Sequence, residues 1–350
     1  KGHEIRLVVS DGMKEDSTSA VLSVDPAHLL QYLQRKLQIP IKGINYFIER
    51  PFAGSPPSDD EMQESLAVIK NELGCNAIRI FGGYEDHLLK CAQIADKIGF
   101  KAISLSPRYG KINQTTDMDI EEHVRRAIDF SKRAEDLRKT SKSNIVLIVG
   151  NELSIDVKGL VEGATYKERI EQMRKTWNAE RNNKLNSYLN HLVSEVRKNF
   201  GGNITYAAGS WEDVDWQNPN IDIVGPNRYV YSTQSARNYA LSKLMHYKKY
   251  GKPVWVSEFG CESYKGASLQ EPYTGQPYSQ EEQANNISES IEFFEKVGGI
   301  QAIFLFMFGS RFLGEEYSPE STYEIMKYQG RESHMRRKLG FYAYQSFSIS

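Results

Sequence analysis

The 350-residue sequence has little cysteine and no excess of either charge. Its three cysteines, Cys75, Cys91 and Cys261, lie far apart, and an odd number leaves at least one thiol free, so we expect buried thiols rather than a disulfide framework. Lysine and arginine number 44 against 45 acidic residues, which gives a net charge of -1. A chain without an overall positive field is a poor ligand for nucleic-acid backbones or anionic membranes. We therefore expect no nucleic-acid partner.

Motifs for metals, dinucleotides and membranes are also missing. The seven histidines are scattered without an HExxH or HxH pairing, and no Cys-x-x-Cys occurs, so no metal site is expected. No G-x-G-x-x-G follows the first predicted strand, which argues against a dinucleotide-binding fold and leaves no cofactor to expect. No segment approaches the ~20 apolar residues of a membrane span. The chain starts at Lys1, so a targeting segment would be invisible and the localisation stays open.

What the sequence does contain is a regular alternation of short apolar runs and longer stretches of helical period from residue 41 onward. This pattern is typical of βα units around a parallel sheet. The predicted strands are 41–47, 77–81, 101–106, 145–150, 204–208, 221–225, 253–259 and 300–308. Several helical stretches end in glycine, as at Gly74, Gly99, Gly251 and Gly298, which suits a helix C-terminus. Eight strands each followed by a helix predict an α/β fold, a closed (β/α)8 TIM barrel.

Two segments exceed a minimal barrel. Residues 1–40 hold a strand candidate at 4–10 and a helix candidate at 26–37, and we interpret them as an N-terminal extension, either a lid on the barrel floor or the end of an upstream domain. Residues 41–350 form the predicted catalytic barrel. A long insertion after strand four, residues 155–200, would fall on the C-terminal face, where loops build the site of such barrels.

Polar residues at the carboxyl ends of barrel strands face a shared mouth and are therefore the candidates for chemistry. They are Arg79, Arg108, Tyr109, Asn151, Glu152, Trp211, Asn227, Tyr229 and Glu258. Glu152 follows the fourth strand and Glu258 lies in the seventh, three units away in an eight-membered ring, so the two carboxyls face each other across one cavity. Glycoside hydrolysis needs such a pair, because one carboxyl protonates the leaving oxygen while the other attacks the anomeric carbon or activates water.

The same residues carry a family resemblance. Asn151-Glu152 and the segment Ser257-Glu258-Phe259-Gly260 resemble the acid/base and nucleophile motifs of retaining β-glycoside hydrolases of clan A, particularly families 2 and 5. Arg79 in AIRIFG resembles the strand-two arginine near the nucleophile. Asn227 and Tyr229 in VGPNRYVY resemble the N-x-Y segment of family 2, in which the tyrosine hydrogen-bonds the nucleophile. KGINY at the first strand also fits, and the resemblance spans about residues 41 to 310.

The resemblance implies roles for these residues. Glu258 would be the nucleophile of a covalent glycosyl-enzyme intermediate, and Glu152 the general acid/base. Arg79 and Tyr229 would keep Glu258 ionised, whereas apolar walls and a neighbouring carboxylate would raise the pKa of Glu152. Asn151 would bind the sugar 2-hydroxyl. The implied partner is a carbohydrate, a β-mannoside, β-glucoside or β-galactoside, with no organic cofactor or metal.

Aromatic residues near the mouth complete the candidate site. Trp211 and Tyr109 are candidates for stacking against the apolar faces of sugar rings. The sequence departs from the family at strand eight, where a tryptophan is common and IFLFMFGS offers Phe306 or Phe308 instead. Arg108 either binds an acidic sugar or pairs with a surface carboxylate, and we favour the surface pair.

Two further carboxylates and two alternative functions also come into question. Glu85 and Glu262 lie near the same face and are interpreted as loop carboxylates. A barrel that binds carbohydrate without cleaving it stays open, and the missing strand-eight tryptophan is its best argument. A phosphate-binding barrel, such as an aldolase or isomerase, predicts a glycine-rich loop after strands seven and eight. Gly260, Gly266 and Gly309 are too dispersed to form one. The sequence does not choose the sugar, the linkage or endo against exo action.

Overall fold

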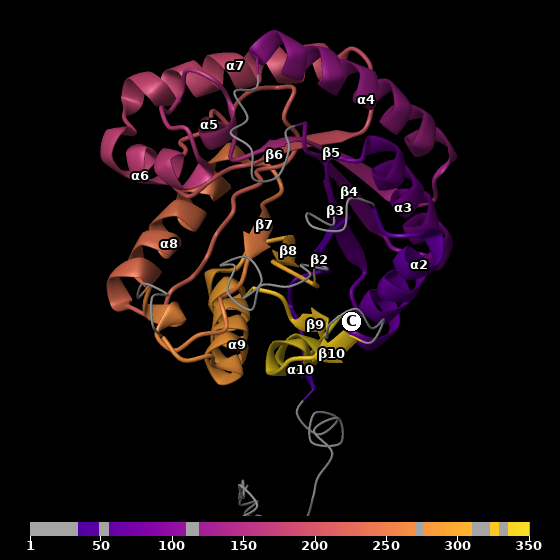
Figure 1. Ribbon diagram of the computed structural model, residues 1–350, viewed down its shortest axis with the longest axis vertical. Coiled ribbons are helices and arrows are strands. Elements are labelled where there is room, and N and C mark those ends of the chain that lie inside the picture. Colours follow the sequence, from indigo (N-terminus) through magenta and orange to yellow (C-terminus); the bar gives the residue numbers. More distant parts are fainter. Residues whose placement is uncertain are drawn as a thin grey trace, which may run out of the picture.

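The computed structural model describes residues 34–48, 56–109, 119–270, 276–309, 323–328 and 335–349. Seven strands form one parallel sheet in the order β6-β5-β4-β3-β2-β8-β7. Their bounds are β2 (Ile41–Phe47), β3 (Ala77–Gly82), β4 (Ala102–Pro107), β5 (Asn144–Asn151), β6 (Asn203–Ala207), β7 (Trp255–Phe259) and β8 (Ala302–Leu305). Figure 1 shows the strands at the centre with the helices arranged around them.

The segment between β6 and β7 closes this sheet into a barrel. On one side Asp222 N donates to Ile204 O at 2.9 Å, and on the other Trp255 N donates to Val224 O at 2.9 Å. We predicted a regular strand at 221–225, and this was wrong in form, because the segment makes isolated parallel bridges rather than a continuous ladder. Pro226 has no N–H to donate, which interrupts regular pairing. The eight-stranded (β/α)8 TIM barrel is nevertheless complete.

Helices follow the strands around the outside of the barrel. They are α2 (Asp59–Ala67), η1 (Val68–Glu72), α3 (Glu85–Ile98), α4 (Ile120–Thr140), α5 (Leu153–Asp156), α6 (Tyr166–Thr176), α7 (Ala179–Arg197), α8 (Gln234–Tyr247), η2 (Lys248–Tyr250), η3 (Ala267–Leu269), α9 (Gln280–Val297) and α10 (Leu339–Gln345). Ser58 and Glu61 form a capping box at the start of α2. Gly99, with φ +93°, ends α3 as predicted, since only glycine adopts this conformation without strain.

The predicted insertion, residues 155–200, contains one regular barrel helix, α7, and a surplus segment before it. Helix α7 packs against α4 and β5 and is the ordinary helix of the fourth βα unit. The surplus is therefore α5, α6 and their connection, which lie next to each other at one edge of the ring (Figure 1). Arg169 of α6 donates to Ile155 O at 2.9 Å and to Gly163 O at 3.0 Å, so this part is fixed by its own backbone carbonyls.

Part of the predicted N-terminal extension can be compared with the structure. The strand candidate at 4–10 and most of the helix candidate at 26–37 lie outside the described residues. At the end of that helix candidate the prediction was wrong: Arg35–Lys36 form strand β1, which pairs in parallel with β11 (Phe347–Ser348). Pairing with a distant strand has overridden local helical period here. A second small sheet joins β9 (Met326–Tyr328) to β10 (Met335–Arg337).

The floor of the barrel holds a buried lysine on the first barrel strand. Lys42 has no exposed surface, and its Nζ donates to the carbonyl oxygens of Leu73, Tyr344 and Phe347 at 2.6, 2.8 and 2.6 Å. Loss of hydration on burial lowers the pKa of Lys42 to about 8. Leu73 follows η1, Tyr344 lies in α10 and Phe347 begins β11. One ammonium group therefore links β2 to these three segments.

The remaining expectations concern cysteines, metals and membranes. Cys75, Cys91 and Cys261 are free and buried, as predicted. Within the described ranges, no three histidine, cysteine or acidic side chains gather as metal ligands. None of the helices in those ranges has the length and apolar composition needed to cross a bilayer.

Candidate active site

Glu258, at the end of β7, is a buried carboxylate with a donor on each oxygen. Its Oε1 accepts from Arg79 Nη1 at 2.7 Å, and its Oε2 accepts from the Tyr229 hydroxyl at 2.9 Å. Only 5% of Glu258 is exposed. The contact with Arg79 is an ion pair, and the contact with Tyr229 is a hydrogen bond from a hydroxyl. The structure therefore brings together the three residues that the sequence assigned to the nucleophile.

Arg79 connects four barrel strands at the floor of the site. Besides Glu258 it reaches Ser106 Oγ on β4 at 3.2 Å and Asn151 Oδ1 on β5 at 2.9 Å. It also donates to Ser257 O on β7 at 3.3 Å. The guanidinium is fully buried, and its planar fork allows several fixed contacts at once. Arg79 thus fixes the position of Glu258 relative to the end of β5.

Glu152 follows Asn151 in an unusual backbone conformation. Its φ of +48° and ψ of +43° place it in the left-handed region, which non-glycine residues rarely adopt. The Glu152 N–H donates to Ala207 O on β6 at 2.9 Å. On its side chain, Oε1 accepts from Asn227 Nδ2 at 2.9 Å. The carboxyl is thereby held by Asn227, which forms a parallel bridge with Glu258.

The two glutamates differ in their electrostatic surroundings. Loss of hydration and, second, the negative charge of Glu258 raise the pKa of Glu152 to about 8, against a smaller opposing effect of the Asn227 hydrogen bond. Glu258 has Arg79 as a cation partner, whereas no lysine or arginine in the described ranges pairs with Glu152. At neutral pH Glu152 therefore holds its proton. A protonated carboxyl and a carboxyl paired with an arginine lie at the same end of the barrel.

Trp211 lies on the Glu152 side of the mouth and is half-buried. Its indole Nε1 donates to Ser154 Oγ at 2.9 Å. A Cβ at Gly209 would lie 2.7 Å from the Trp211 ring, so the ring lies flat on that glycine. The predicted stacking residue is thus held by Ser154, two residues after Glu152.

The other predicted aromatic residues occupy two different settings. The Tyr109 ring lies 4.9 Å from the His123 ring and 4.9 Å from the Arg126 guanidinium, so its described contacts are with α4 rather than with either glutamate. Phe306, just past β8, is partly exposed. Its ring contacts Tyr323 edge-on at 5.6 Å, and Tyr323 contacts Tyr229 in the same way at 5.6 Å.

Two site residues escaped the sequence reasoning. Tyr323 lies far along the chain from any predicted strand end and reaches the site because its carbonyl accepts from Met307 N beyond β8. Glu212 follows Trp211 after β6 and is 2% exposed beneath the Glu152 turn. The sequence GSWED does show a further carboxylate after a barrel strand, but it does not show where that side chain points.

The remaining candidates lie at the edge of the site. Glu85 begins α3 and pairs with Arg126 and Arg133 at 2.9 and 3.3 Å, in keeping with its reading as a peripheral carboxylate. Glu262 hydrogen-bonds Tyr264 after β7. Arg108 makes no ion pair with any described residue, so the surface pair that we favoured does not form there.

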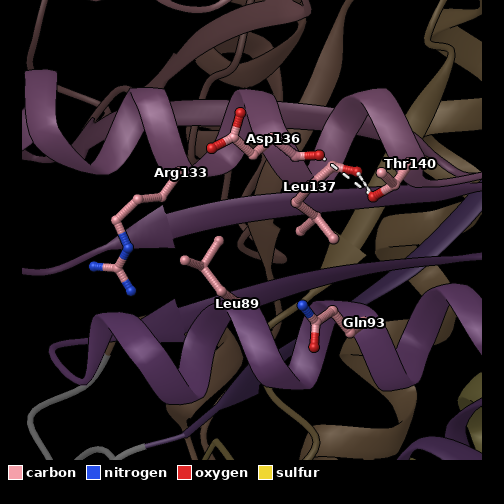
Figure 2. A pocket seen from close by; sticks show the side chains of 6 residues that line it. All are labelled: Leu89, Gln93, Arg133, Asp136, Leu137 and Thr140. Atoms are coloured by element: carbon pink, nitrogen blue, oxygen red, sulfur yellow. Dashed lines mark hydrogen bonds between the residues drawn. The ribbon is translucent and has the colours of Figure 1, made fainter.

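A pocket of about 330 Å³ lies elsewhere, on the outside of the barrel between α3 and α4. It is lined by Leu89, Gln93, Arg133, Asp136, Leu137 and Thr140. Figure 2 shows Leu89 and Gln93 of α3 and Arg133 and Leu137 of α4 reaching into the space between the two helices. None of them contacts either glutamate, and the pocket holds no opposed acid and carboxylate.

Comparisons with known proteins bear on the fold and on the class of protein. The model of Glycoside Hydrolase Family 113 matches residues 175–326, a range that includes Glu258 and Tyr229 but not Glu152. No curated protein matches the sequence. A family 113 β-1,4-mannanase in complex form is similar in structure, with 16% identity, a TM-score of 0.57, and coverage of 89% of this chain and 99% of that one.

Two β-glucuronidases share the same fold over part of their length. The enzyme from Bifidobacterium dentium, complexed with coumarin-3-O-glucuronide, has 16% identity and a TM-score of 0.60, and 88% of this chain covers 46% of it. The enzyme from Ruminococcus gnavus has 14% identity and a TM-score of 0.60, with coverage of 88% and 50%.

These similarities confirm the (β/α)8 barrel and the resemblance to clan A. The chain is a glycoside hydrolase that acts on O-glycosyl bonds. The matching model is that of family 113, which the motifs did not distinguish from families 2 and 5.

Proposed function

We propose that this enzyme hydrolyses a β-glycosidic bond with retention, by double displacement, with Glu258 as nucleophile and Glu152 as general acid/base. The observation that carries the proposal is the contrast between the two carboxyls. Glu258 has a cation and a hydroxyl donor on its oxygens, whereas the pKa of Glu152 is raised to about 8. An ionised nucleophile and a protonated acid are the two states that the first step requires.

In the first step, a Glu258 oxygen forms a bond to the anomeric carbon while the bond from that carbon to the leaving oxygen breaks. The proton of Glu152 passes to the leaving oxygen, so the aglycone departs as a neutral alcohol. The products of this step are a glycosyl ester on Glu258 and an ionised Glu152. Arg79 and Tyr229, which contact Glu258, orient the attacking carboxylate.

The second step reverses the roles. The ester at Glu258 carries no charge, so the repulsion that helps to raise the pKa of Glu152 is gone, and that pKa falls. Glu152 then accepts a proton from water as the water oxygen attacks the anomeric carbon. The ester bond breaks, and Glu258 leaves as a carboxylate. The same pair thereby returns to its starting protonation state.

Asn151 is suited to bind the sugar 2-hydroxyl. Its side-chain oxygen accepts from Arg79 at 2.9 Å and from Asn227 at 3.2 Å. These contacts fix the amide so that its NH₂ group is the part left to donate. A donor beside the nucleophile, held in this way, can strengthen its contact as charge develops on the sugar ring.

For the substrate, we propose a neutral β-linked hexoside. A β-1,4-mannan is the first to test, because nearly the whole length of the mannanase aligns with this chain. Trp211 beside Glu152 would stack on the leaving-group sugar. Phe306 and Tyr323 would supply the apolar wall of the glycosyl subsite in place of the family's tryptophan.

Trapping with 2-deoxy-2-fluoro glycosyl fluorides tests the mechanism. Reagents of the manno, gluco and galacto series are incubated with the wild type and with Glu258→Gln, and each intact protein is weighed. We expect a single glycosyl addition to the wild type, mapped to Glu258, and none to the variant. Addition at another residue would overturn the assignment.

The same experiment separates hydrolysis from binding alone. A carbohydrate-binding barrel would show neither addition nor hydrolysis of aryl β-glycosides in any of the three series. It would still bind manno-oligosaccharides by calorimetry. That combination would replace the catalytic proposal with the binding alternative.

A further inference from the structure

The left-handed turn at Glu152 is held from beneath by residues that follow β6. The Leu153 N–H donates to the Tyr206 hydroxyl at 2.7 Å, and the Ser154 N–H donates to Glu212 Oε1 at 3.1 Å. These are the two peptide groups directly after Glu152. A non-glycine residue stays in this backbone region only where its surroundings hold it there.

Glu212 is the centre of this arrangement. The Tyr206 hydroxyl lies 2.9 Å from each of its oxygens, and the Gly209 N–H donates to Oε2 at 2.8 Å. The hydroxyl that accepts from Leu153 therefore donates its own proton to Glu212. One carboxylate thus fixes both peptide groups after Glu152, one directly and one through Tyr206.

Glu212 is also costly to keep where it is. It is 2% exposed, and no lysine or arginine in the described ranges pairs with it. Loss of hydration raises the pKa of Glu212 to about 7, although the hydrogen bonds from Ser154, Tyr206 and Gly209 oppose this. An uncompensated buried charge is expensive, and a turn could be held by a neutral side chain. Above about pH 7 Glu212 is a buried carboxylate, and its charge then acts on the groups around it.

We propose that Glu212 is a positioning residue for the acid/base: it holds the backbone that aims Glu152 at the leaving oxygen, and its negative charge keeps the catalytic proton on Glu152. The inference rests on the proposed role of Glu152. It adds a third carboxylate to the pair, one that never touches the substrate.

The charged groups around Glu152 define what its proton senses. Three carboxylates raise its pKa: Glu258 on β7 most strongly, then Glu212, and then Asp156 in α5. Asn227 opposes them with its hydrogen bond. Removal of the Glu212 charge should therefore lower the pKa of Glu152, and the activity that depends on its protonated form should end at lower pH.

The test compares Glu212→Gln, Glu212→Asp and Glu135→Gln with the wild type. Glutamine keeps the shape but removes the charge, whereas aspartate keeps the charge and draws the oxygens back by one methylene. Glu135 is the matched control, since it is a hydrogen-bonded carboxylate of α4 that accepts from Arg138 and from Gly201 N outside the site. For each protein, kcat/KM is measured across pH on aryl β-glycosides with good and with poor leaving groups.

We expect Glu212→Gln to lose about 10- to 100-fold in kcat/KM on poor leaving groups and much less on good ones, as weakened general acid catalysis requires. Its alkaline limb should move down by about half a pH unit or more. Glu212→Asp should lose rate but keep the wild-type limb. Glu135→Gln should match the wild type in both.

Several results would overturn the inference. One is an unmoved alkaline limb in Glu212→Gln, or an equal loss on both classes of leaving group, while the wild type is active. If Glu212→Gln does not fold by circular dichroism, Tyr206→Phe takes its place, because it removes only the hydroxyl under Leu153. An unchanged leaving-group dependence in Tyr206→Phe would then contradict the positioning role. Inactivity of the wild type itself would instead refute the proposed function.

Discussion

Glu152 and Glu258 have chemically identical side chains at the same end of the barrel, and they differ only in their neighbours. Arg79 and Tyr229 place donors on both oxygens of Glu258. Glu152 has one amide donor, from Asn227, and faces the charge of Glu258. These surroundings are made by side chains within one or two hydrogen bonds of the carboxyls, so single substitutions can test them.

Replacement of Glu152 by glutamine should affect only reactions that need a proton donor. We expect kcat/KM to fall by about 10²- to 10⁴-fold on oligosaccharides and other poor leaving groups, and much less on dinitrophenyl glycosides. Steady-state kinetics across a leaving-group series measure this. In the wild type, activity on poor leaving groups should decline above about pH 8, where Glu152 loses its proton. Equal losses across the whole series would contradict the acid role.

Tyr229→Phe should weaken the nucleophile without disturbing the acid. The variant loses one donor to Glu258 and keeps the ring contact with Tyr323. With one hydrogen bond fewer, the attacking carboxyl of Glu258 is held less firmly in its orientation. We expect a loss of about 10-fold or more at neutral pH, from a charge-assisted bond worth roughly 1.5–3 kcal/mol. Steady-state kinetics with a good leaving group check it, and Tyr239→Phe, which removes an exposed hydroxyl of α8 that donates to Ser210 O, is the matched control.

The sequence could predict Glu152, Glu258, Arg79 and Tyr229 because barrel topology sends strand ends to one place, whatever the sequence distance between them. Glu212 could not be predicted in the same way, since its role depends on the positive φ of Glu152. Backbone conformation at a single residue leaves no periodic signal. Tyr109 illustrates the reverse case, because a residue past a strand end packs against α4 instead.

At the scale of elements, the segment after β6 is the least regular part of the barrel and also carries Asn227 and Tyr229. Its bridges to β6 and β7 must form without a continuous ladder. Gly225 lies where it comes closest to β6: a Cβ there would be 2.5 Å from both Thr205 Oγ1 and Tyr206 O. The close approach of two backbones thus depends on a missing side chain.

Gly225→Ala should therefore push the segment away from β6. We expect the free energy of unfolding to fall by about 1–3 kcal/mol, the usual cost of overpacking, together with a loss of activity as Asn227 and Tyr229 move. Thermal or urea unfolding measures the first effect. Gly201→Ala is the control, since its Cβ would meet nothing closer than 3.4 Å. Equal stability of the two variants would show that the close approach is not required.

Strand positions were predictable from apolar runs, because seven of the eight predicted runs lie in regular, buried strands. The ends were less so: the run at 300–308 predicted nine residues, and β8 has four, Ala302–Leu305. Beyond Leu305 single hydrogen bonds continue from Phe306 N to Phe259 O and from Phe308 N to Asn45 O, and the chain also pairs with the segment at 323–326. Apolar composition continues past the point where regular pairing stops, so it marks burial rather than strand length.

At the scale of the whole molecule, the site makes the protein less stable as the pH rises. From pH 4.5 up to about 7 the folded protein keeps a proton on Glu212, and up to about 8 it keeps one on Glu152, whereas the unfolded chain has released both. The free energy of unfolding contributed by these groups is then fully present below pH 4.5 and declines through this window. The catalytic arrangement therefore opposes folding at the pH where it works.

Glu152→Gln should accordingly be more stable than the wild type at pH 8, by on the order of 2 kcal/mol, and no more stable at pH 4.5. Urea unfolding at the two pH values measures the difference. Glu135→Gln should behave in the opposite sense and lose stability at pH 8, because Arg138 lowers the pKa of Glu135 to about 2. A pH-independent effect of Glu152→Gln would contradict the raised pKa.

Lys42 has a consequence for the order in which the protein assembles. Its three carbonyl partners include Tyr344 and Phe347, about three hundred residues further along the chain, and its strand β2 pairs with β8 as well as β3. During synthesis, the first barrel strand must therefore wait with an open edge until β8 and α10 leave the ribosome. Contacts so distant in sequence slow folding and expose unpaired strands to other chains. The nascent enzyme should depend on chaperones until residue 347 has been made.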